Sequence, residues 1–318
     1  MALLGCMSLF APWPLKIILD SVLGQHPLHP WLAALGGIFT HRAGIFNIAL
    51  EGYMLVGAFV AVVTTAATGS PLLGMCAAVG VVALTALVMG FVVLDLGGDV
   101  IVVGIAVNLL ASALTSFLLQ SATGGAAFLR VPAGIPDVQL AAVSGIPIIG
   151  GLFATQGILV WVSLVLVPLV GLTITRTSLG LRLRAVGEQP DAAISSGVDV
   201  RQTQYIAFAL CGALCGLAGA QLALGLLNLF SFNMTAGRGI IAFAAVIFGA
   251  GKARWVMIAA LIFGLADAVA NRMQTLGLPV QFVVMVPYVL TIVALIAAAV
   301  PWRRLFATRN RASVMGRA

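Results

Sequence analysis

Few polar residues that could carry chemistry lie within the long apolar stretches of this sequence, and the first two are an amide and a carboxylate. Asn47 precedes Glu51 by four residues, so a continuous helix would place both side chains on one face. Polar side chains are costly inside a membrane, which makes them candidates for function wherever they occur there. We expect these two residues to form a polar site or gate on a solute path, or else a hydrogen-bonded contact of Glu51 that fixes helix packing.

Two further groups of polar residues lie in apolar surroundings. Asn108 and Ser112 are also four residues apart, which suits either the lining of a path for hydroxyl-bearing solutes or hydrogen bonding between helices. Gln221, Phe232 and Asn233 cluster at and beyond the end of a later apolar segment. An amide beside an aromatic ring suits the face of a sugar or a nucleoside base, and packing in an outer loop is the alternative.

Residues for catalysis or for a metal site are not grouped in the sequence. The cysteines lack metal-ligand spacing and the histidines do not cluster with acids. The stretch Gly249–Lys252 is only superficially similar to a phosphate-binding loop, because that motif needs glycine where Val246 stands and serine or threonine where Ala253 stands. We therefore expect a chain that is not an enzyme, with no catalytic residue, no metal and no bound cofactor.

The elements that position these residues must be membrane helices. Of the 318 residues, 62% are hydrophobic and 8% are charged, whereas soluble domains carry about 25% charged residues. This deficit leaves too little polar surface to cover a soluble enzyme. The net charge of +7 comes from basic residues in short loops and in the tail, so it does not indicate a nucleic-acid partner. The composition predicts an all-α, polytopic protein embedded in a lipid bilayer.

A helix that crosses a membrane needs about 20 apolar residues. The segment 238–250 is apolar but shorter, and we expect it to be a half-helix or a broken crossing. The N-terminal residues 2–40 are interrupted by prolines and supply one broken span or two short ones. We expect about 8–10 transmembrane helices, with longer spans at 45–68, 72–94, 100–119, 156–175, 204–226, 255–270 and 280–300.

Lysine and arginine residues are distributed unequally between the two sides that these spans define. Lysine and arginine are enriched on the cytoplasmic side of membrane proteins. With 238–250 counted as a crossing, the outside holds only Arg130, Arg238 and Arg272. The inside then holds Arg42, Arg176, Arg182, Arg184, Arg201, Lys252, Arg254, Arg303, Arg304, Arg309, Arg311 and Arg317. This asymmetry predicts a cytoplasmic C-terminus.

The predicted cytoplasmic loop 176–203 is the most informative polar stretch. Pro190 suits the first turn of a helix, Asp191 complements the dipole at its start, and Gly197 suits the position just past its end. The pattern predicts a short helix over 191–196. Such a helix between two spans has the size of a knob that enters a groove of another protein, while a basic loop that only fixes the topology is the alternative.

Several motifs, in this order along the chain, resemble those of one transporter superfamily. GLRLRAVGEQPDAA, followed by GVDV, is similar to the cytoplasmic loop of permease subunits of ABC importers in the branched-chain amino acid and simple-sugar permease superfamily. RAGIFNIALEGYMLVGAF (42–59) and FNMTAGRGIIAFAAVIFG (232–249) are similar to motifs of its nucleoside and simple-sugar branch. The resemblance covers about residues 35–300 and points to the shorter of two permeases that pair in this branch.

This resemblance implies a permease domain over 35–300, preceded by an atypical segment, 1–34, and followed by a basic cytoplasmic tail, 301–318. It implies an importer of a nucleoside or a simple sugar in a bacterial-type cytoplasmic (inner) membrane. The implied partners are an ATP-binding protein that hydrolyses ATP with magnesium, a second, paralogous permease and an extracytoplasmic substrate-binding lipoprotein. The residues implied to contact the ATP-binding protein are Gly187, Glu188, Pro190, Asp191, Ala192 and Ala193.

Three other functions stand as alternatives. Branched-chain amino acids are the alternative cargo within the same superfamily. An ion-coupled secondary transporter would need intramembrane acids or an internal inverted repeat, and Glu51 and Asp267 give it thin support. A passive channel would have no need of the loop 176–203.

Overall fold

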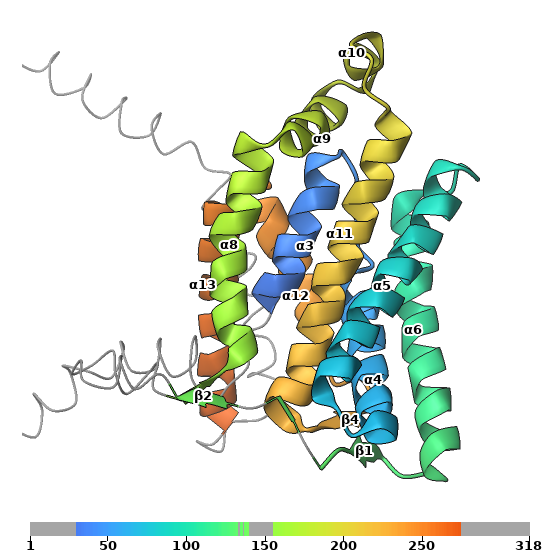
Figure 1. Cartoon of the computed structure of the whole chain (residues 1–318), viewed down its shortest axis with the longest axis vertical. Coiled ribbons are helices and arrows are strands. Elements are labelled where there is room, and N and C mark those ends of the chain that lie inside the picture. Colours follow the sequence, from blue (N-terminus) through green and yellow to red (C-terminus); the bar gives the residue numbers. More distant parts are fainter. Residues whose placement is uncertain (1–29, 133, 136, 140–154, 275–318) are drawn as a thin grey trace, which may run out of the picture. The chain divides into compact units, whose positions relative to one another are not determined.

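The computed structural model describes residues 30–132, 134–135, 137–139 and 155–274 (Figure 1). The chain divides into two compact units, Met1–Ala268 and Val269–Ala318. The first unit contains the helix bundle that positions the candidate residues.

Helices make up most of the described chain. They are α3 (Pro30–Arg42), α4 (Leu50–Thr68), α5 (Pro71–Leu94), α6 (Val100–Thr123), α8 (Ile158–Arg176), α9 (Ser178–Glu188), α10 (Pro190–Ser195), α11 (Val200–Ala220), the π-helix η1 (Gln221–Leu227), α12 (Arg238–Phe248) and α13 (Ala253–Gln274). Four short strands form two antiparallel pairs: β1 (Phe128–Arg130) with β4 (Leu229–Ser231), and β2 (Asp137–Gln139) with β3 (Thr155–Gly157). The predicted helical membrane class is confirmed.

Local sequence sets where the long helices begin and end. α5 has Pro71 in its first turn, where a helix does not use the backbone N–H that proline lacks. α6 follows Asp99, whose carboxylate accepts hydrogen bonds from the backbone N–H groups of Ile101 and Val102. α4 ends at Gly69, which takes the left-handed conformation with φ 71°.

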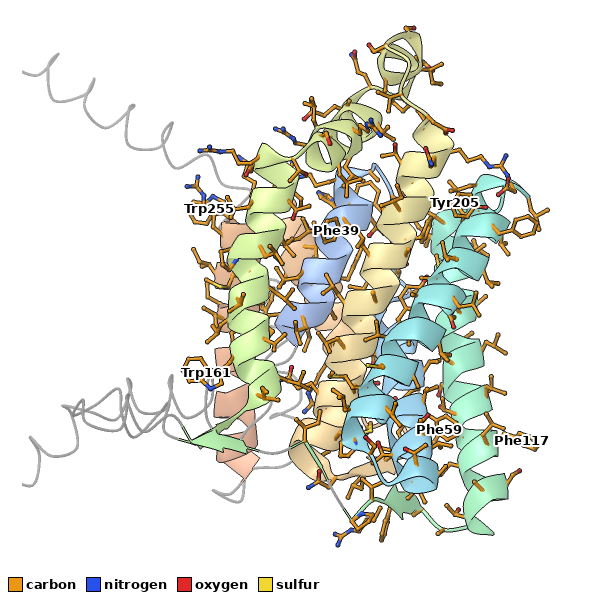
Figure 2. The ribbon with its side chains drawn as sticks, viewed as in Figure 1. Phe39, Phe59, Phe117, Trp161, Tyr205 and Trp255 are labelled. Atoms are coloured by element: carbon orange, nitrogen blue, oxygen red, sulfur yellow. The ribbon has the colours of Figure 1, made fainter. Side chains whose placement is uncertain are left out.

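α4 and α11 form the centre of the bundle, and α5 and α6 cover it from outside. Within the most apolar 18 residues of each span, 61% are buried in α4 and 67% in Val200–Gly225, which comprises α11 and most of η1. The corresponding share is 28% in α5 and 17% in α6. α4 and α11 approach closely because Gly57 faces Gly216, where an added Cβ would lie 2.9 Å from the Gly216 Cα. Phe117 on α6 projects away from the bundle (Figure 2), as a lipid-facing side chain does.

The two ends of the bundle differ. α9 and α10 lie at one end, with the C-terminal ends of α3 and α5 and the N-terminal ends of α6 and α11 (Figure 1). We call this the α10 end, and the opposite one, where β1 pairs with β4, the β1–β4 end. The helices near the α10 end carry the basic residues Arg42, Arg176, Arg182, Arg184 and Arg201, and Lys252 follows Gly251, which contacts Arg42.

Most of the predicted spans correspond to helices with shifted ends. The segments 72–94, 100–119, 156–175 and 255–270 match α5, α6, α8 and α13. The segment 204–226 is divided between α11 and η1. Within the described residues, four helices are long and apolar enough to cross a membrane, or up to five if the bent pair α8–α9 is one span. The predicted span 280–300 and the tail 301–318 lie outside the described residues, as do residues 1–29 of the N-terminal segment.

The segment 238–250 contains a short helix, as expected. α12 has 11 residues and follows β4 after a series of turns. Just beyond it, the Gly251 carbonyl accepts a hydrogen bond from Arg42 Nε at 2.8 Å, at the α10 end. The chain from β4 to Gly251 therefore runs from one end of the bundle to the other, with turns in one half and α12 in the other.

Candidate functional site

An irregular segment, residues 43–49, separates α3 from α4 and contains the first candidate residue. Because α4 begins only at Leu50, Asn47 and Glu51 do not share a helix face, and that prediction is wrong. The chain turns at Gly44, with φ 80°. Asn47 is buried, and its side-chain oxygen accepts a hydrogen bond from the Ala49 N–H at 3.0 Å. This local bond competes with helical pairing and holds the backbone outside the helix.

Asn108 on α6 satisfies the backbone around this irregular segment. Its Oδ1 accepts a hydrogen bond from the Gly52 N–H at 2.7 Å, and its Nδ2 donates to the Ile48 carbonyl at 3.0 Å. These contacts favour the interhelical role among the two that we predicted. Ser112, one turn further along α6, is partly exposed, and its backbone carbonyl accepts a hydrogen bond from the Ser116 hydroxyl.

Glu51 joins the first turn of α4 to the first turn of α12. Its Oε1 accepts a hydrogen bond from the Gly237 N–H at 2.8 Å, and its Oε2 accepts one from the Gly239 N–H. The first N–H groups of a helix lack intrahelical partners, and a carboxylate there also complements the positive end of the helix dipole. Glycine is needed at 239, because an added Cβ would lie 2.8 Å from Glu51 Oε2. We call these two hydrogen bonds the Glu51 clamp.

Arg238, which the topology count places outside, begins α12 beside the clamp. Its Nη1 donates to the carbonyls of Met234 at 3.2 Å and Thr235 at 3.3 Å. Within the described residues, its buried Nε has no hydrogen-bond partner. The guanidinium therefore turns back over the chain that leads into α12 and adds a positive charge near the start of the helix.

The chain that leads into α12 has an unusual backbone. Asn233, Ala236 and Gly237 all have positive φ, at 49°, 46° and 84°. This region is crowded for alanine because of its Cβ, and such strain concentrates at functional sites. Phe232 is 63% exposed and Asn233 is also exposed. These two predicted path residues are therefore accessible on the surface of the described chain.

Gln221 marks the point where α11 changes into the π-helix η1. It is 2% exposed, and in the described part of the chain its Oε1 has no hydrogen-bond partner. Single π-helical turns are frequent at functional sites. Gln221 is buried, whereas Phe232 and Asn233 are exposed, so the three candidate path residues differ in their accessibility.

The loop 176–203 contains two helices, whereas its sequence led us to expect one. α10 is the predicted short helix, with Gly197 in the left-handed conformation (φ 78°) beyond it. α9 follows α8 after a bend of 69° and is the helix that we did not predict. Its Leu183 and Val186 are buried three residues apart, and this helical spacing is the signal that could have revealed it.

Most residues implied to contact an ATP-binding protein are accessible. Glu188, Pro190, Asp191 and Ala192 are exposed, and Ala193 is buried beneath them. A groove of about 380 Å³ between α9 and α10 is lined by Ala185, Glu188, Gln189, Ala192, Ala193, Ser196 and Val198. A second groove, of about 400 Å³, is lined by Leu94, Ile194, Val198, Asp199, Val200, Arg201 and Gln204.

Gly187, the remaining member of that set, packs against the bundle. A Cβ added to Gly187 would lie 2.9 Å from the carbonyl carbon of Arg42 and from the amide nitrogen of Gly44, and closer still to the Arg42 oxygen. This backbone contact joins the end of α9 to the start of segment 43–49. A continuous series of contacts therefore leads from α10 through α9 and segment 43–49 to the first turn of α4, where Glu51 lies.

A third polar cluster, which sequence reasoning missed, surrounds Asp95 at the end of α5. Asp95 Oδ1 forms an ion pair with Arg201 on α11, and Asp95 Oδ2 accepts a hydrogen bond from the hydroxyl of Tyr205, also on α11. The partners are far apart in the sequence, so no local pattern announces them. The cluster ties the α10 end of α11 to the turn between α5 and α6.

Residues that bind metals are not assembled in the described part of the chain. No group of three or more His, Cys, Asp or Glu residues there could hold a metal ion. Cys211 and Cys215 are buried on α11, whereas Cys76 on α5 is exposed. Asn47 Nδ2 lies 3.6 Å from Cys211 Sγ, so this cysteine contributes to the packing of segment 43–49.

Known proteins resemble this chain over nearly all of the bundle. Residues 30–295 match the family described as branched-chain amino acid transport system / permease component. The guanosine ABC transporter permease protein NupQ of Bacillus subtilis is 32% identical over 83% of this chain and 86% of its own length. The nucleoside ABC transporter permease protein NupC of Lactococcus lactis is 36% identical over 82% of this chain and 86% of its own length. The putative glucose ABC transporter permease protein TsgC13 of Haloferax volcanii is 34% identical over 78% of this chain and 75% of its own length. No solved structure matches the chain significantly.

Proposed function

The chain belongs to the family of permease components of the branched-chain amino acid transport system, and from this premise we propose that its cargo is a nucleoside or a simple sugar. It is a multi-pass transport subunit of an ABC importer. The proposed cargo rests on relatives that match most of the chain and are named for guanosine, nucleosides and glucose. Branched-chain amino acids, after which the family is described, are the less favoured cargo. A relative named for them, the probable branched-chain amino acid transport permease protein LivH of Methanocaldococcus jannaschii, is 28% identical over only 48% of this chain.

The observation that carries the proposed mechanism is the series of contacts that begins at α10. In this mechanism an ATP-binding partner docks on the exposed residues Glu188, Pro190, Asp191 and Ala192 and on the groove that they border. The partner hydrolyses ATP, and its closure displaces α10 and α9. Gly187 passes this displacement to segment 43–49 through its backbone contact with Arg42 and Gly44.

The proposed solute path runs beside segment 43–49 and the start of α12. Asn47, Glu51 and Asn108 provide hydrogen-bond partners for the irregular backbone there, so that it can lie within the membrane-spanning bundle without unpaired polar groups. Ser112, Gln221, Phe232 and Asn233 are the further residues that we propose for contact with the cargo. Ser112 is partly exposed, and Gln221 is buried with no hydrogen-bond partner for its Oε1 among the residues that the structure describes, and both observations support this assignment.

We place the α10 end in the cytoplasm, because basic residues gather there and lysine and arginine are enriched on the cytoplasmic side of membrane proteins. The proposed membrane is the cytoplasmic membrane, and the distribution of lysine and arginine along the sequence supports a cytoplasmic C-terminus. The β1–β4 end receives the cargo from a substrate-binding lipoprotein. A second, paralogous permease completes the path, and the family membership supports both assignments.

Reconstitution tests this function. The tagged chain is purified with its co-expressed ATP-binding protein and second permease, and uptake of tritiated guanosine, glucose and leucine into proteoliposomes is measured. We expect uptake of guanosine or glucose that requires both ATP and the substrate-binding lipoprotein, which is added outside the proteoliposomes. Uptake by the solitary chain, driven by a proton or sodium gradient, would contradict the proposal and favour a secondary transporter.

A further inference from the structure

Arg42, the last residue of α3, contacts both α9 and the chain just beyond α12. Its backbone carbonyl lies against Gly187 at the end of α9, so closely that a Cβ at Gly187 would collide with it. Its side chain extends to the other element, where Nε donates a hydrogen bond of 2.8 Å to the Gly251 carbonyl. One residue therefore joins the helix that precedes α10 to the chain that follows α12.

Gly251 belongs to a tight turn that is bonded to the last turn of α12. The Gly251 N–H donates to the Val246 carbonyl at 3.2 Å, and the Ala250 N–H donates to the Ile247 carbonyl at 3.0 Å. These bonds satisfy carbonyls that a helix end leaves without intrahelical partners. Gly251 is buried and has a φ of 61°. The hydrogen bond from Arg42 to Gly251 therefore holds the end of α12 itself.

Both ends of α12 are held by charged side chains that complement its dipole. Glu51 accepts hydrogen bonds from N–H groups at the positive, N-terminal end, and Arg42 donates a hydrogen bond at the negative, C-terminal end. The 11 residues of α12 separate these ends by about 16 Å. Arg42 and Glu51 flank segment 43–49, so the two ends of the irregular segment are fixed to the two ends of α12.

The middle of α12 packs against the two helices that segment 43–49 connects. A Cβ added to Gly37 of α3 would lie 3.0 Å from Val246 Cγ2 on α12 and 3.1 Å from Leu50 Cδ2 on α4. Val246 and Leu50 are both buried. α12, segment 43–49 and the adjoining ends of α3 and α4 therefore form one packed unit, and a displacement of Arg42 acts on all of it.

The charged neighbours of Arg42 also connect it to α9. Arg42 is partly buried, and its guanidinium is attracted by Glu188 and repelled by Arg184, both of which lie on α9. Glu188 is exposed and belongs to the proposed contact with the ATP-binding partner. A movement of α9 therefore acts on Arg42 through charge as well as through packing.

We propose that Arg42 is a positioning residue that passes the displacement of α9 to the end of α12, so that α12 and segment 43–49 move together as one unit. This inference rests on the proposed function, because it needs an ATP-binding partner that displaces α10 and α9. It extends the route beyond segment 43–49 to the helix whose start borders the proposed solute path. A residue that only stabilised the end of α12 would leave that helix in place when α9 moves.

Distances between spin labels measure this movement in the complete transporter. One label replaces either Ile240 on α12 or Leu181 on α9, and the second replaces Leu84 on α5, all of which are exposed. The native cysteines Cys6 and Cys76 are first replaced by alanine. Each distance is measured without nucleotide and with a non-hydrolysable ATP analogue, which keeps the partner closed.

In the wild type we expect the nucleotide to shift both the α9 label and the α12 label. An α12 label that stays in place while the α9 label shifts would overturn this inference and leave the proposed function intact. An α9 label that does not shift would defeat the proposed function, and this inference with it. The wild-type measurement needs no variant of Arg42, so it decides the question even if such a variant does not assemble.

Arg42→Met tests the side chain itself, because it removes the donor and the charge but keeps the backbone contact with Gly187. We expect the α9 label to shift as in the wild type and the α12 label to lose its shift, while guanosine uptake per ATP hydrolysed falls at least about fivefold. Arg42→Lys keeps a charged donor and restores part of both. Lys252→Met, which removes a positive charge from an exposed position next to Gly251, is the matched control and behaves as wild type. A wild-type shift of α12 in Arg42→Met would refute the role of Arg42.

Gly251→Ala perturbs the same contact from the other side while Arg42 is kept. The added Cβ would lie 2.6 Å from His41 Cδ2 and 3.0 Å from Arg42 Nε, so it forces the turn beyond α12 away from Arg42. We expect this variant, too, to lose the shift of the α12 label and to keep that of the α9 label. An unchanged response of the α12 label in Gly251→Ala would count against the proposal.

Discussion

Replacement of Gly187 by alanine is the sharpest perturbation of the proposed coupling route. Gly187 is where α9 contacts segment 43–49, and an added Cβ would lie 2.9 Å from both the Arg42 carbonyl carbon and the Gly44 nitrogen. Carbon–oxygen contacts normally begin at about 3.3 Å, so α9 and the chain at Arg42 must separate by roughly 1 Å to admit the methyl group. The substitution therefore displaces α9 from Arg42 and Gly44 without removing a polar group.

The energies indicate that this variant folds but couples poorly. Overpacking costs about 1–3 kcal/mol, and alanine regains about 1 kcal/mol through its higher helix propensity. The net loss of stability is then about 0–2 kcal/mol, which leaves the bundle folded. Coupling free energies between two sites are of the order of 1–3 kcal/mol. If the substitution removes about 1–2 kcal/mol of the coupling between the ATP-binding partner and the solute path, transport per ATP hydrolysed falls about 5–30-fold.

The assay measures guanosine uptake and ATP hydrolysis in the same proteoliposomes, for wild type, Gly187→Ala and the control Gly80→Ala. We expect Gly187→Ala to keep its ATPase activity and to lose most of its uptake, whereas Gly80→Ala behaves as wild type because its added Cβ meets no atom within 4 Å. A wild-type ratio of uptake to hydrolysis in correctly assembled Gly187→Ala would refute this reasoning about the contact.

Two further predictions concern the stability of the bundle, measured by thermal unfolding in detergent. Asn108→Ala leaves the Gly52 N–H and the Ile48 carbonyl without their partner, and we expect a loss of stability of about 1–3 kcal/mol for each group. The control Ser112→Ala, one turn away on α6, changes the stability by less than about 0.5 kcal/mol. Similar losses for the two variants would contradict the role of Asn108. Tyr205→Phe removes the hydroxyl that donates to Asp95 and costs about 1–2 kcal/mol. In an Asp95→Ala background the same change has little effect if the two side chains interact, and a full loss in that background would show that they do not.

The sequence was sufficient to predict the features that depend on local composition. The apolar runs 72–94 and 100–119 correspond to α5 and α6 because each run alone is long enough to form a spanning helix. Pro190 and Gly197 bracket α10 because proline suits a helix start and glycine the position beyond its end. These signals act within one turn of the chain and need no tertiary partner.

The sequence misled us where distant residues decide the backbone. The regular apolar pattern of 45–68 predicts a helix through Asn47, but bonds from Asn108 satisfy the open backbone on both sides of Glu51 and permit the irregular segment. Glu51 therefore pairs with Gly237 and Gly239, which lie far away in the sequence, and not with its neighbour. Polar residues in apolar surroundings identified the right side chains but could not name their partners.

The central claim, that ATP-driven motion enters this chain at α10, is tested most directly by reversing the exposed charges of α9 and α10. The measurement is guanosine uptake per ATP hydrolysed by the reconstituted transporter with the double substitution Glu188→Arg and Asp191→Arg, both at exposed positions. The account predicts that the variant is expressed and assembled normally and hydrolyses ATP, while uptake falls to background. Uptake at the wild-type rate, or uptake that persists without any ATP-binding protein, would contradict it.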